Sequence, residues 1–296
     1  VQGSRGVSMN NLGTISNCIF SIAGASKYAY DGTLPTMSDY NLFYVTGIPA
    51  CIVVIDKEDA RARKGIFMID ASKGFIKDGN KNRLRAQDIH RIVDTFTRQL
   101  EVPRYARMVG LAEISDPKND FNLNLPRYID ASEPEDLQDI DAHLRGGIPE
   151  RDIDALDRYW QVLPAVRPLL FESAGRPGYS RLKLPAGEIK AAIFGHAEFT
   201  AYNASVTALF AKWKKAHAPR LNAIKTGDHP KALLETLSEE LLAIFGKASL
   251  IGPYDVYQHL MDYWAATLQD DVYLVADAGW VEAAKPRLIV ETKEQK

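Results

Sequence analysis

The stretch NLFYVTGIPACIVVIDK, Asn41 to Lys57, decides the fold that the chain is expected to build. Its second half, Ile48 to Asp56, is a run of mainly β-branched apolar residues closed by charges, which predicts a strand buried on both faces. In the first half, Gly47 supplies backbone freedom and Pro49 fixes φ. The residues ahead of them are therefore expected to form an open loop at the entrance of the strand.

Phe43 and Tyr44 are an aromatic pair on this expected loop, and two interpretations of them stay open. Loops at the ends of sheet strands are where α/β proteins place ligands, which favours a binding role. The alternative is that both rings only plug the end of the core. The spacing of these residues alone favours the second interpretation, in which both rings fill the end of the core.

A second strand and a helix are expected to follow. The sequence GIFMID, Gly65 to Asp70, is another short apolar run, and the polar, basic connection before it indicates two antiparallel neighbours in one sheet. A loop from Lys73 to Asn82 comes next. Beyond it, apolar residues recur at the spacing of an amphipathic helix that ends before Pro103: Ile89, Ile92, Val93, Phe96 and Leu100.

The acidic, Pro-containing stretch from Ser132 to Asp141 is expected to connect two domains, residues 9–130 and 131–296. Val1 to Ser8 precede Met9 without the pattern of a secretory signal and are set aside from the fold prediction. The second domain is expected to be mainly helical. Helical periodicity marks Ile153–Leu163, Gly187–Ala216, Lys231–Phe245 and Tyr254–Leu268, and the strand-like stretches are Val272–Ala276 and Leu288–Val290.

The net charge of −2 conceals an asymmetry between neighbouring segments. Lys57 to Arg107 contains 13 basic and 7 acidic residues, a balance of +6, whereas Leu111 to Arg158 contains 5 and 13, a balance of −8. A basic patch that contacts phosphates is one interpretation, and a solvated helix face is the slightly favoured alternative. The arginines concerned are Arg83, Arg85, Arg91, Arg98, Arg104 and Arg107.

Other classes of site find no support in the sequence. Cys18 and Cys51 lack CxxC or Cys/His spacing, which argues against a disulfide framework and a thiolate metal site and favours the reducing cytoplasm. The six histidines are scattered, so no metal site is expected. The acidic residues between Asp136 and Asp157 lack the pattern of a calcium loop and are interpreted as a solvated connector. No apolar run approaches the roughly 20 residues of a membrane span.

Several stretches of the chain resemble the methylating subunit of type I restriction-modification systems, an adenine-N6 DNA methyltransferase family. The resemblance is most specific in the first domain and extends less specifically into the helical part, over roughly Asn41 to Ile289. It rests on NLFYVTGIPACIVVIDK, then RKGIFMIDAS (Arg63–Ser72), GNKNRLRAQDIHRIVDT (Gly79–Thr95), DFNLNLPRYID (Asp120–Asp130), DIDAHLRGGIP (Asp139–Pro149), GDHPKALLETLSEELL (Gly227–Leu242) and PYDVYQHLMDYW (Pro253–Trp264).

The resemblance implies an α/β fold: the C-terminal part of a Rossmann-like class I methyltransferase sheet, followed by a mainly α-helical extension. It also implies methyl transfer from S-adenosylmethionine to an adenine extruded from DNA, in a complex with a specificity subunit and a restriction subunit. An aromatic face replaces the lost base stacking, worth about 1–3 kcal/mol per base. The implied base-pocket residues are Phe43, Tyr44, Asn41, Thr46, Gly47 and Pro49, with Phe43 at the stacking position.

The sequence also departs from that family. It contains neither a glycine-rich cofactor loop of the Asp-Pro-Ala-Cys-Gly-Thr-Gly kind nor an Asn-Pro-Pro-Tyr or Asn-Pro-Pro-Phe loop. The chain is therefore expected to carry no catalytic residue and to be inactive alone, and the alternative is a non-catalytic assembly or DNA-binding module. The open sheet edge is expected to be covered by residues 9–40 or by self-association with a second copy.

Overall fold

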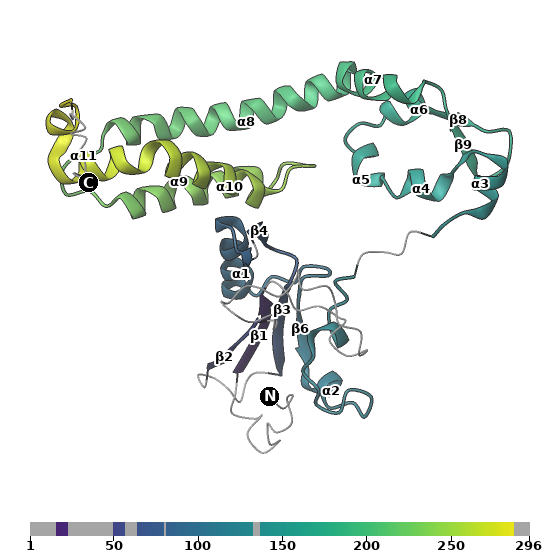
Figure 1. The fold of residues 1–296 in the computed structure, drawn as a ribbon, viewed down its shortest axis with the longest axis horizontal. Coiled ribbons are helices and arrows are strands. Elements are labelled where there is room, and N and C mark those ends of the chain that lie inside the picture. The colour runs from purple at the N-terminus through teal and green to yellow at the C-terminus, as the bar shows by residue number, and fades with distance from the viewer. Residues whose placement is uncertain (1–15, 23–49, 57–63, 80, 133–136, 287–296) are drawn as a thin grey trace, which may run out of the picture. The chain divides into compact units, whose positions relative to one another are not determined.

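The computed structural model describes residues 16–22, 50–56, 64–79, 81–132 and 137–286 as a mixture of helices and strands (Figure 1). The chain divides into two compact units, residues 1–135 and 136–296. The division falls close to the expected boundary at 130/131, and the functional assignment of the two domains stays a prediction. Within the described residues, no helix combines the length and hydropathy that a membrane span needs.

The first unit is built on a four-stranded sheet with the order β2-β1-β3-β6. β1 runs parallel to β3, and the other two neighbouring pairs are antiparallel. The prediction that the strands now labelled β2 and β3 are neighbours is wrong, because β1 lies between them and bonds to both. The strands are β1 (Ser16–Ile22), β2 (Ala50–Asp56), β3 (Gly65–Ala71) and β6 (Ala106–Gly110).

β2 is an edge strand, so the prediction that it is buried on both faces is also wrong. Ile52 and Val53 point to opposite faces, and they are 42% and 52% exposed. β2 has one hydrogen-bonded neighbour among the described strands, β1, along the register from Ser16↔Asp56 to Ile22↔Ala50. β1 belongs to residues 9–40, but it pairs with β2 from inside the sheet, so coverage of the open edge by these residues or by a second copy stays a prediction.

β3 is the strand that is buried on both faces. Its apolar residues Ile66, Phe67, Met68 and Ile69 are each at most 2% exposed. Phe67 and Ile69 belong to one core cluster, and Ile66 and Met68 belong to another. β3 therefore forms the centre of the first unit, with an apolar layer on each side.

Helix α1 (Ala86–Arg98) lies over one of these layers and confirms the predicted helix. Ile92 is buried in that cluster, and Phe96 packs against it. Ile89 and Val93 were expected on the same apolar face, but both are about half exposed. The helix thus buries a narrower stripe than the periodicity predicts.

Short elements complete the first unit. A hairpin of β4 and β5 connects β3 to α1, and its strands pair from Ile76↔Arg83 to Asp78↔Lys81. The opposite layer is closed by residues that follow β6, among them Ile114, Leu125 and Tyr128. The elements are β4 (Ile76–Asp78), β5 (Lys81–Arg83), α2 (Leu111–Ile114) and η3 (Leu125–Arg127).

The second unit begins with short helices around a three-stranded antiparallel sheet of order β7-β9-β8. Leu163, Val166 and Leu170 form its core. The single helix predicted over residues 153–163 is wrong, since α4 and α5 are separate short helices. The elements are α3 (Ile140–Arg145), β7 (Ile148–Pro149), α4 (Glu150–Asp154), α5 (Asp157–Trp160), α6 (Val166–Leu170), β8 (Phe171–Ser173), β9 (Tyr179–Leu182), η4 (Ala186–Glu188) and α7 (Ile189–Gly195).

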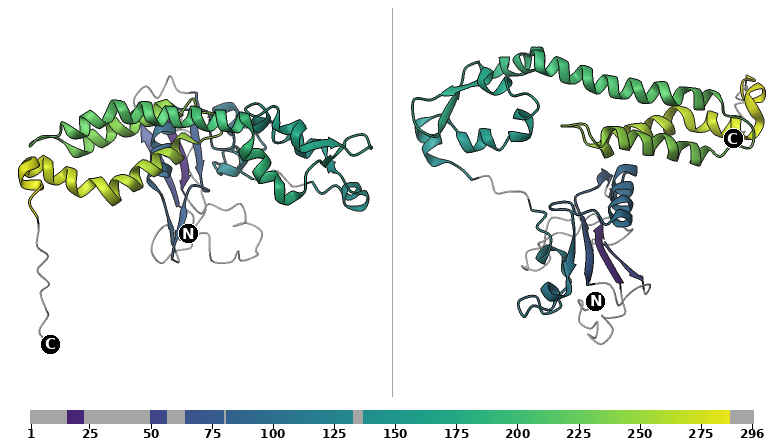
Figure 2. Two further views of the ribbon diagram at one scale, coloured as in Figure 1. Left: turned by 90° about the horizontal axis from the view of Figure 1, so that it is seen from above. Right: turned by 180° about the vertical axis from the view of Figure 1, so that it is seen from behind.

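A helical bundle forms the rest of the second unit, and Figure 2 shows the long helix α8 running along it and on toward α7. The helix predicted over residues 187–216 is interrupted at His196, whose side chain accepts a hydrogen bond from the Glu198 N–H. The helix predicted over residues 231–245 is confirmed. The elements are α8 (Ala197–Asn222), α9 (Pro230–Phe245), α10 (Pro253–Tyr263), the π-helical turn η5 (Trp264–Leu268) and α11 (Gln269–Ala283).

The strand-like stretch Val272–Ala276 is part of helix α11, so that prediction is wrong. Val272, Val275 and Ala276 are buried, and their i, i+3, i+4 spacing places them on one helical face. Packing of this face into the bundle core overrides the preference of valine for strands. The second predicted strand, Leu288–Val290, lies outside the described residues.

Candidate functional site

Three strand ends meet at one edge of the four-stranded sheet, which we name the Ala71 edge. In the sheet register, Ile22 at the end of β1 is the partner of both Ala50 at the start of β2 and Ala71 at the end of β3. The carboxyl ends of parallel strands are where open α/β sheets bind ligands. The Ala71 edge is therefore the candidate ligand-binding part of the sheet.

The predicted base-pocket residues belong to the segment 23–49, whose two flanking residues, Ile22 and Ala50, are both at the Ala71 edge. The segment itself lies outside the described residues. The predicted roles in base binding stay predictions for all six: Asn41, Phe43, Tyr44, Thr46, Gly47 and Pro49.

A tight turn leads the chain away from the Ala71 edge. The Oδ1 atom of Asp70 accepts a hydrogen bond from the Ser72 N–H at 3.0 Å, and the Gly74 N–H donates to the Ala71 carbonyl at 3.1 Å. The Asp70 N–H in turn donates to the carbonyl of Tyr105 at 2.7 Å. The turn therefore places the following β4–β5 hairpin directly beside this edge.

The buried carboxylate of Asp88 holds Arg85 at the end of that hairpin and lies close to Gly74 near its start. Its Oδ2 accepts from the backbone N–H of Arg85 at 2.9 Å and from Arg85 Nε at 2.8 Å, and its Oδ1 accepts from Arg85 Nη2 at 2.9 Å. At the other end, a β-carbon on Gly74 would lie only 3.1 Å from Asp88 Oδ1. The close approach of these two ends requires a glycine there.

Arg91 stacks on an aromatic ring within the first unit. Its guanidinium carbon lies 3.9 Å from the centroid of the Tyr105 ring, a cation–π contact. Burial raises the pKa of the Tyr105 phenol to about 12, while the positive charge of Arg91 acts in the opposite direction. The phenol is therefore neutral across the physiological range.

Arg83 has a more open environment than Arg85 and Arg91, which belong to the same predicted basic patch. Its Nε lies 3.0 Å from Asp78 Oδ2 across the hairpin, and both side chains are exposed. The structure thus brings Arg83, Arg85 and Arg91 into one region, where Arg83 is 59% exposed and Arg85 and Arg91 are partly buried. The sequence interpretation missed Asp88, although an acidic residue three positions after the start of a helix is a recognisable capping signal.

The described residues do not fit S-adenosylmethionine. A cofactor loop of the expected kind is rich in glycine and opens a helix directly after a parallel strand. After β3, the turn from Ala71 to Gly74 leads into strand β4 instead. The residues that follow the other parallel strand, β1, lie outside the described part of the chain.

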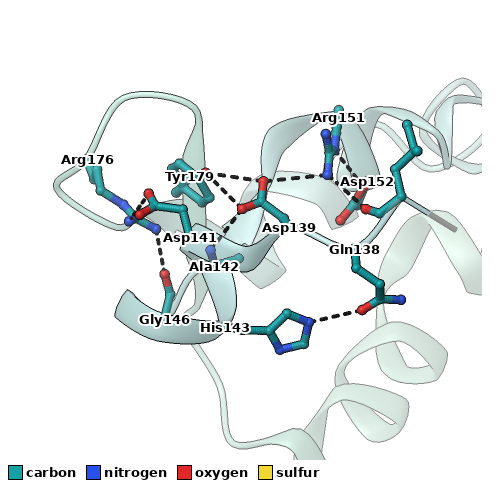
Figure 3. A network of polar contacts seen from close by, with 11 residues as sticks. Gln138, Asp139, Asp141, Ala142, His143, Gly146, Arg151, Asp152, Arg176 and Tyr179 are labelled. Atoms are coloured by element: carbon teal, nitrogen blue, oxygen red, sulfur yellow. Dashed lines mark hydrogen bonds and ion pairs between the residues drawn. The ribbon is translucent and has the colours of Figure 1, made fainter.

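A second group of polar side chains lies at the start of the second unit (Figure 3). Asp139 caps α3 by accepting from the Ala142 N–H at 2.9 Å, and it also accepts from the Tyr179 hydroxyl at 3.2 Å. The hydrogen bond from Ala142 is the main cause that lowers the pKa of Asp139. Arg176 donates to Asp141 at 2.6 Å and stacks on Tyr179.

These contacts change the interpretation as a solvated connector for Asp139 alone, which is 18% exposed, whereas Asp141, Asp152 and Asp154 are 45%, 54% and 59% exposed. Asp139, Asp141, Asp152 and Asp154 all form ion pairs with arginines, and the group joins α3, α4 and β9. Over the residues that the structure describes, no group of His, Cys, Asp and Glu side chains is arranged to hold a metal ion. The hydrogen bonds that Asp139 accepts from Ala142 and Tyr179 join the start of α3 to β9.

Comparison with known proteins finds similarity to DNA methylases in one part of the chain. The N-6 DNA methylase family matches residues 35–137. The methylase subunits of the type I restriction enzymes MjaVII and MjaVIII from Methanocaldococcus jannaschii are 36% and 34% identical over 104 residues. That of MpnII from Mycoplasma pneumoniae is 30% identical over 100 residues. The resemblance predicted from sequence is confirmed for this part of the chain.

These matches cover only a small part of this chain and of each relative. Each covers 34% of this chain, and the chain spans only 17% or 18% of the length of these relatives. Among solved structures, the type I restriction-modification methyltransferase subunit from Streptococcus thermophilus is 26% identical with a TM-score of 0.31, and the match covers 40% of this chain and 21% of that one.

Proposed function

We propose that this chain supplies the base-binding and closing part of an adenine-N6 DNA methyltransferase subunit of a type I restriction-modification system. The observation that carries the proposal is the family match over residues 35–137, which includes the predicted pocket residues 41–49 and two of the three strand ends at the Ala71 edge, Ala50 and Ala71. In this proposal the four-stranded sheet is the C-terminal portion of a Rossmann-like sheet, and the second unit is its helical extension.

The proposed chemistry begins with extrusion of the target adenine from the DNA duplex. Phe43 stacks on the extruded base and replaces part of the stacking that the base loses. Tyr44 forms the adjoining wall, and Asn41, Thr46 and the backbone at Gly47 and Pro49 contact the base edge or a phosphate.

The methyl donor of the proposed reaction is S-adenosylmethionine, held by residues outside those described here. The chain alone is proposed to be inactive and to act with DNA, a specificity subunit and a restriction subunit in the cytoplasm. A second candidate function is a non-catalytic assembly or DNA-binding module. It is favoured by the large helical unit, residues 136–296, which lies almost entirely outside the family match.

A calorimetric titration of the full chain with S-adenosylmethionine tests the second candidate function and any autonomous activity. Saturable binding with a defined stoichiometry would contradict the assembly-only function. No heat of binding at millimolar cofactor would remove any autonomous methyltransferase activity, and it is the result that we expect for the chain alone.

A fluorescence experiment tests the base pocket. The adenine analogue 2-aminopurine gains fluorescence when it leaves the stack, so a duplex that carries it reports base extrusion when the chain is added together with the other subunits. Phe43→Ala is expected to weaken DNA binding and change this signal. Phe194→Ala removes an exposed aromatic ring in the second unit and is the matched control. Equal behaviour of Phe43→Ala and the unchanged protein would remove Phe43 from the pocket.

A further inference from the structure

We infer that the β4–β5 hairpin and its flanks, described over residues 72–79 and 81–85, contact the phosphates of double-stranded DNA through Lys73, Lys77 and Arg83, whereas Arg85 and Arg91 form contacts that build the first unit. This inference rests on the proposed function and deepens it. It divides the basic residues of this region into those that contact DNA phosphates and those whose contacts stabilise the first unit.

The charge of this segment is strongly one-sided. Five of its residues are basic and one, Asp78, is acidic, which gives a balance of +4. Lys73, Lys77 and Arg83 are exposed. A local excess of exposed positive charge is complementary to a phosphate backbone. The basic residues are Lys73, Lys77, Lys81, Arg83 and Arg85.

The segment is also fixed in place before any ligand arrives. Phe75 at its base packs against the core cluster under α1, and Lys77 lies over the Phe75 ring at 5.5 Å. Asp88 pairs with Arg85 at the end of the segment, and its carboxylate lies close to Gly74 near the start. A preorganised element loses little conformational entropy on binding, so its charges contribute more of their interaction to affinity.

The position of the segment matches what base extrusion requires. It begins directly after Ala71, at the edge where Ile22 and Ala50 flank the predicted pocket residues. Extrusion rotates a nucleotide about its backbone, so the neighbouring phosphates must be held while the base turns. Contacts to phosphate also fix the register of a protein on the duplex without reading its sequence.

Arg85 and Arg91 are unsuited to the same role because their contacts lie inside the first unit. If Arg85 turned toward a phosphate, the buried carboxylate of Asp88 would lose its counter-charge. Arg91 would give up its stacking on Tyr105. By contrast, the pair of Arg83 with Asp78 is exposed at both side chains, and exposed pairs contribute little to stability. Arg83 can therefore exchange Asp78 for a phosphate at small cost.

The test measures binding of the full chain to a short fluorescein-labelled DNA duplex by anisotropy, between about 50 and about 200 mM salt. The variant combines Lys73→Ala, Lys77→Ala and Arg83→Ala. Each lost phosphate contact is expected to reduce the slope of log affinity against log salt by about 1, so the slope should fall by about 3 and the affinity by at least about tenfold. Arg91→Ala is expected to leave the slope unchanged.

A matched control removes the same charge elsewhere. Lys212, Lys214 and Lys215 are exposed on α8, and replacing all three by alanine should leave the slope as in the unchanged chain. An unchanged slope in the hairpin variant, an equal loss in the control, or a loss of about 1 with Arg91→Ala would each overturn the inference. Absence of any duplex binding by the unchanged chain would overturn it too. The 2-aminopurine experiment judges the proposed function separately.

Discussion

The Asp88 carboxylate accepts three hydrogen bonds from Arg85, one from its backbone N–H and two from its guanidinium, at 2.8 to 2.9 Å. Asp88 is buried, and the pair closes the first turn of α1. Hydrogen bonds to an ionised group are about twice as strong as neutral ones. The pair therefore fixes the start of the helix and the end of the hairpin together.

Replacing Asp88 by Asn is expected to lower the free energy of unfolding by about 2 kcal/mol, because the amide cannot accept all three hydrogen bonds and leaves the guanidinium without its counter-charge. Urea unfolding followed by circular dichroism measures the change. Asp78→Asn in the hairpin is the control, since Asp78 and its partner Arg83 are 63% and 59% exposed and this change should cost less than about 1 kcal/mol. Equal costs for the two variants would contradict the assigned role of Asp88.

Gly65 and Gly110 are register partners in β3 and β6, but they should respond differently to alanine. A β-carbon on Gly65 would clash with the carbonyl oxygen of Val109 and lie 3.0 Å from its carbonyl carbon. Because these are backbone atoms, Gly65→Ala is expected to destabilise the first unit by about 1–3 kcal/mol.

Gly110 provides the control, because a β-carbon there meets nothing within 4 Å and its φ of −68° suits any residue. Gly110→Ala is expected to be neutral or to stabilise by up to about 1 kcal/mol. Chemical denaturation of both variants decides the matter. A loss of stability in Gly110→Ala together with unchanged stability in Gly65→Ala would contradict the packing described for this strand pair.

The Tyr105 phenol should make unfolding dependent on pH in the alkaline range. Its pKa is raised from 10.0 to about 12 in the folded chain. Above pH 10 the unfolded state ionises while the folded state does not, so the stabilisation is fully present below pH 10 and is lost as the pH rises toward about 12. Tyr105→Phe is expected to reduce this loss of stability.

Ultraviolet absorbance of the phenolate gives the pKa directly, as the difference between the titrations of the unchanged chain and Tyr105→Phe. A difference curve centred near 10 would contradict the burial of this phenol. Arg91→Ala should shift the curve to still higher pH, because the positive charge of Arg91 lowers the pKa of Tyr105. Tyr263→Phe, at an exposed position, controls for the loss of one phenol.

Leu237 of α9 is 1% exposed within the core of the helical bundle. Leu237→Ala is expected to destabilise the second unit by about 2–5 kcal/mol through lost burial and the cavity that remains. Fluorescence of Trp213 and Trp264, which belong to the same core, reports its unfolding. Leu144→Ala, at a position that is 78% exposed, should change stability by less than about 0.5 kcal/mol.

Elements whose apolar pattern is local could be predicted from the sequence. In α9, the spacing of Leu237, Leu241 and Phe245 predicts the buried stripe that the structure has. β3 is likewise a short apolar run that is buried on both faces. In such cases the residues that determine an element are the residues within it.

Pairing and burial between distant segments could not be predicted in the same way. β2 and β3 have similar apolar runs, and nothing within either shows that β1 lies between them. The valines of α11 resemble a strand until the bundle core that buries them is known.

The candidate site shows the same limit. The arginine cluster is visible in the sequence, but the contact of Arg91 with Tyr105 arises only when α1 packs beside the strand β6. The relation of Arg85 to Asp88 is local and could have been recognised from the spacing of a capping pair. The pocket residues 41–49 remain a prediction from resemblance.

The central place of β1 has a consequence for how the first unit folds. Because β2 and β3 bond through β1 rather than to each other, the short connection between them does not close a hairpin. Both pairings of β1 require closure of long loops, which is paid in chain entropy before the strand contacts form. During synthesis both pairings of β1 can be completed only after Ala71 has left the ribosome, and the four-stranded sheet only after Gly110 has. Proteolytic cleavage ahead of Ala50 would remove the middle strand and leave β2 with no described neighbour to bond to.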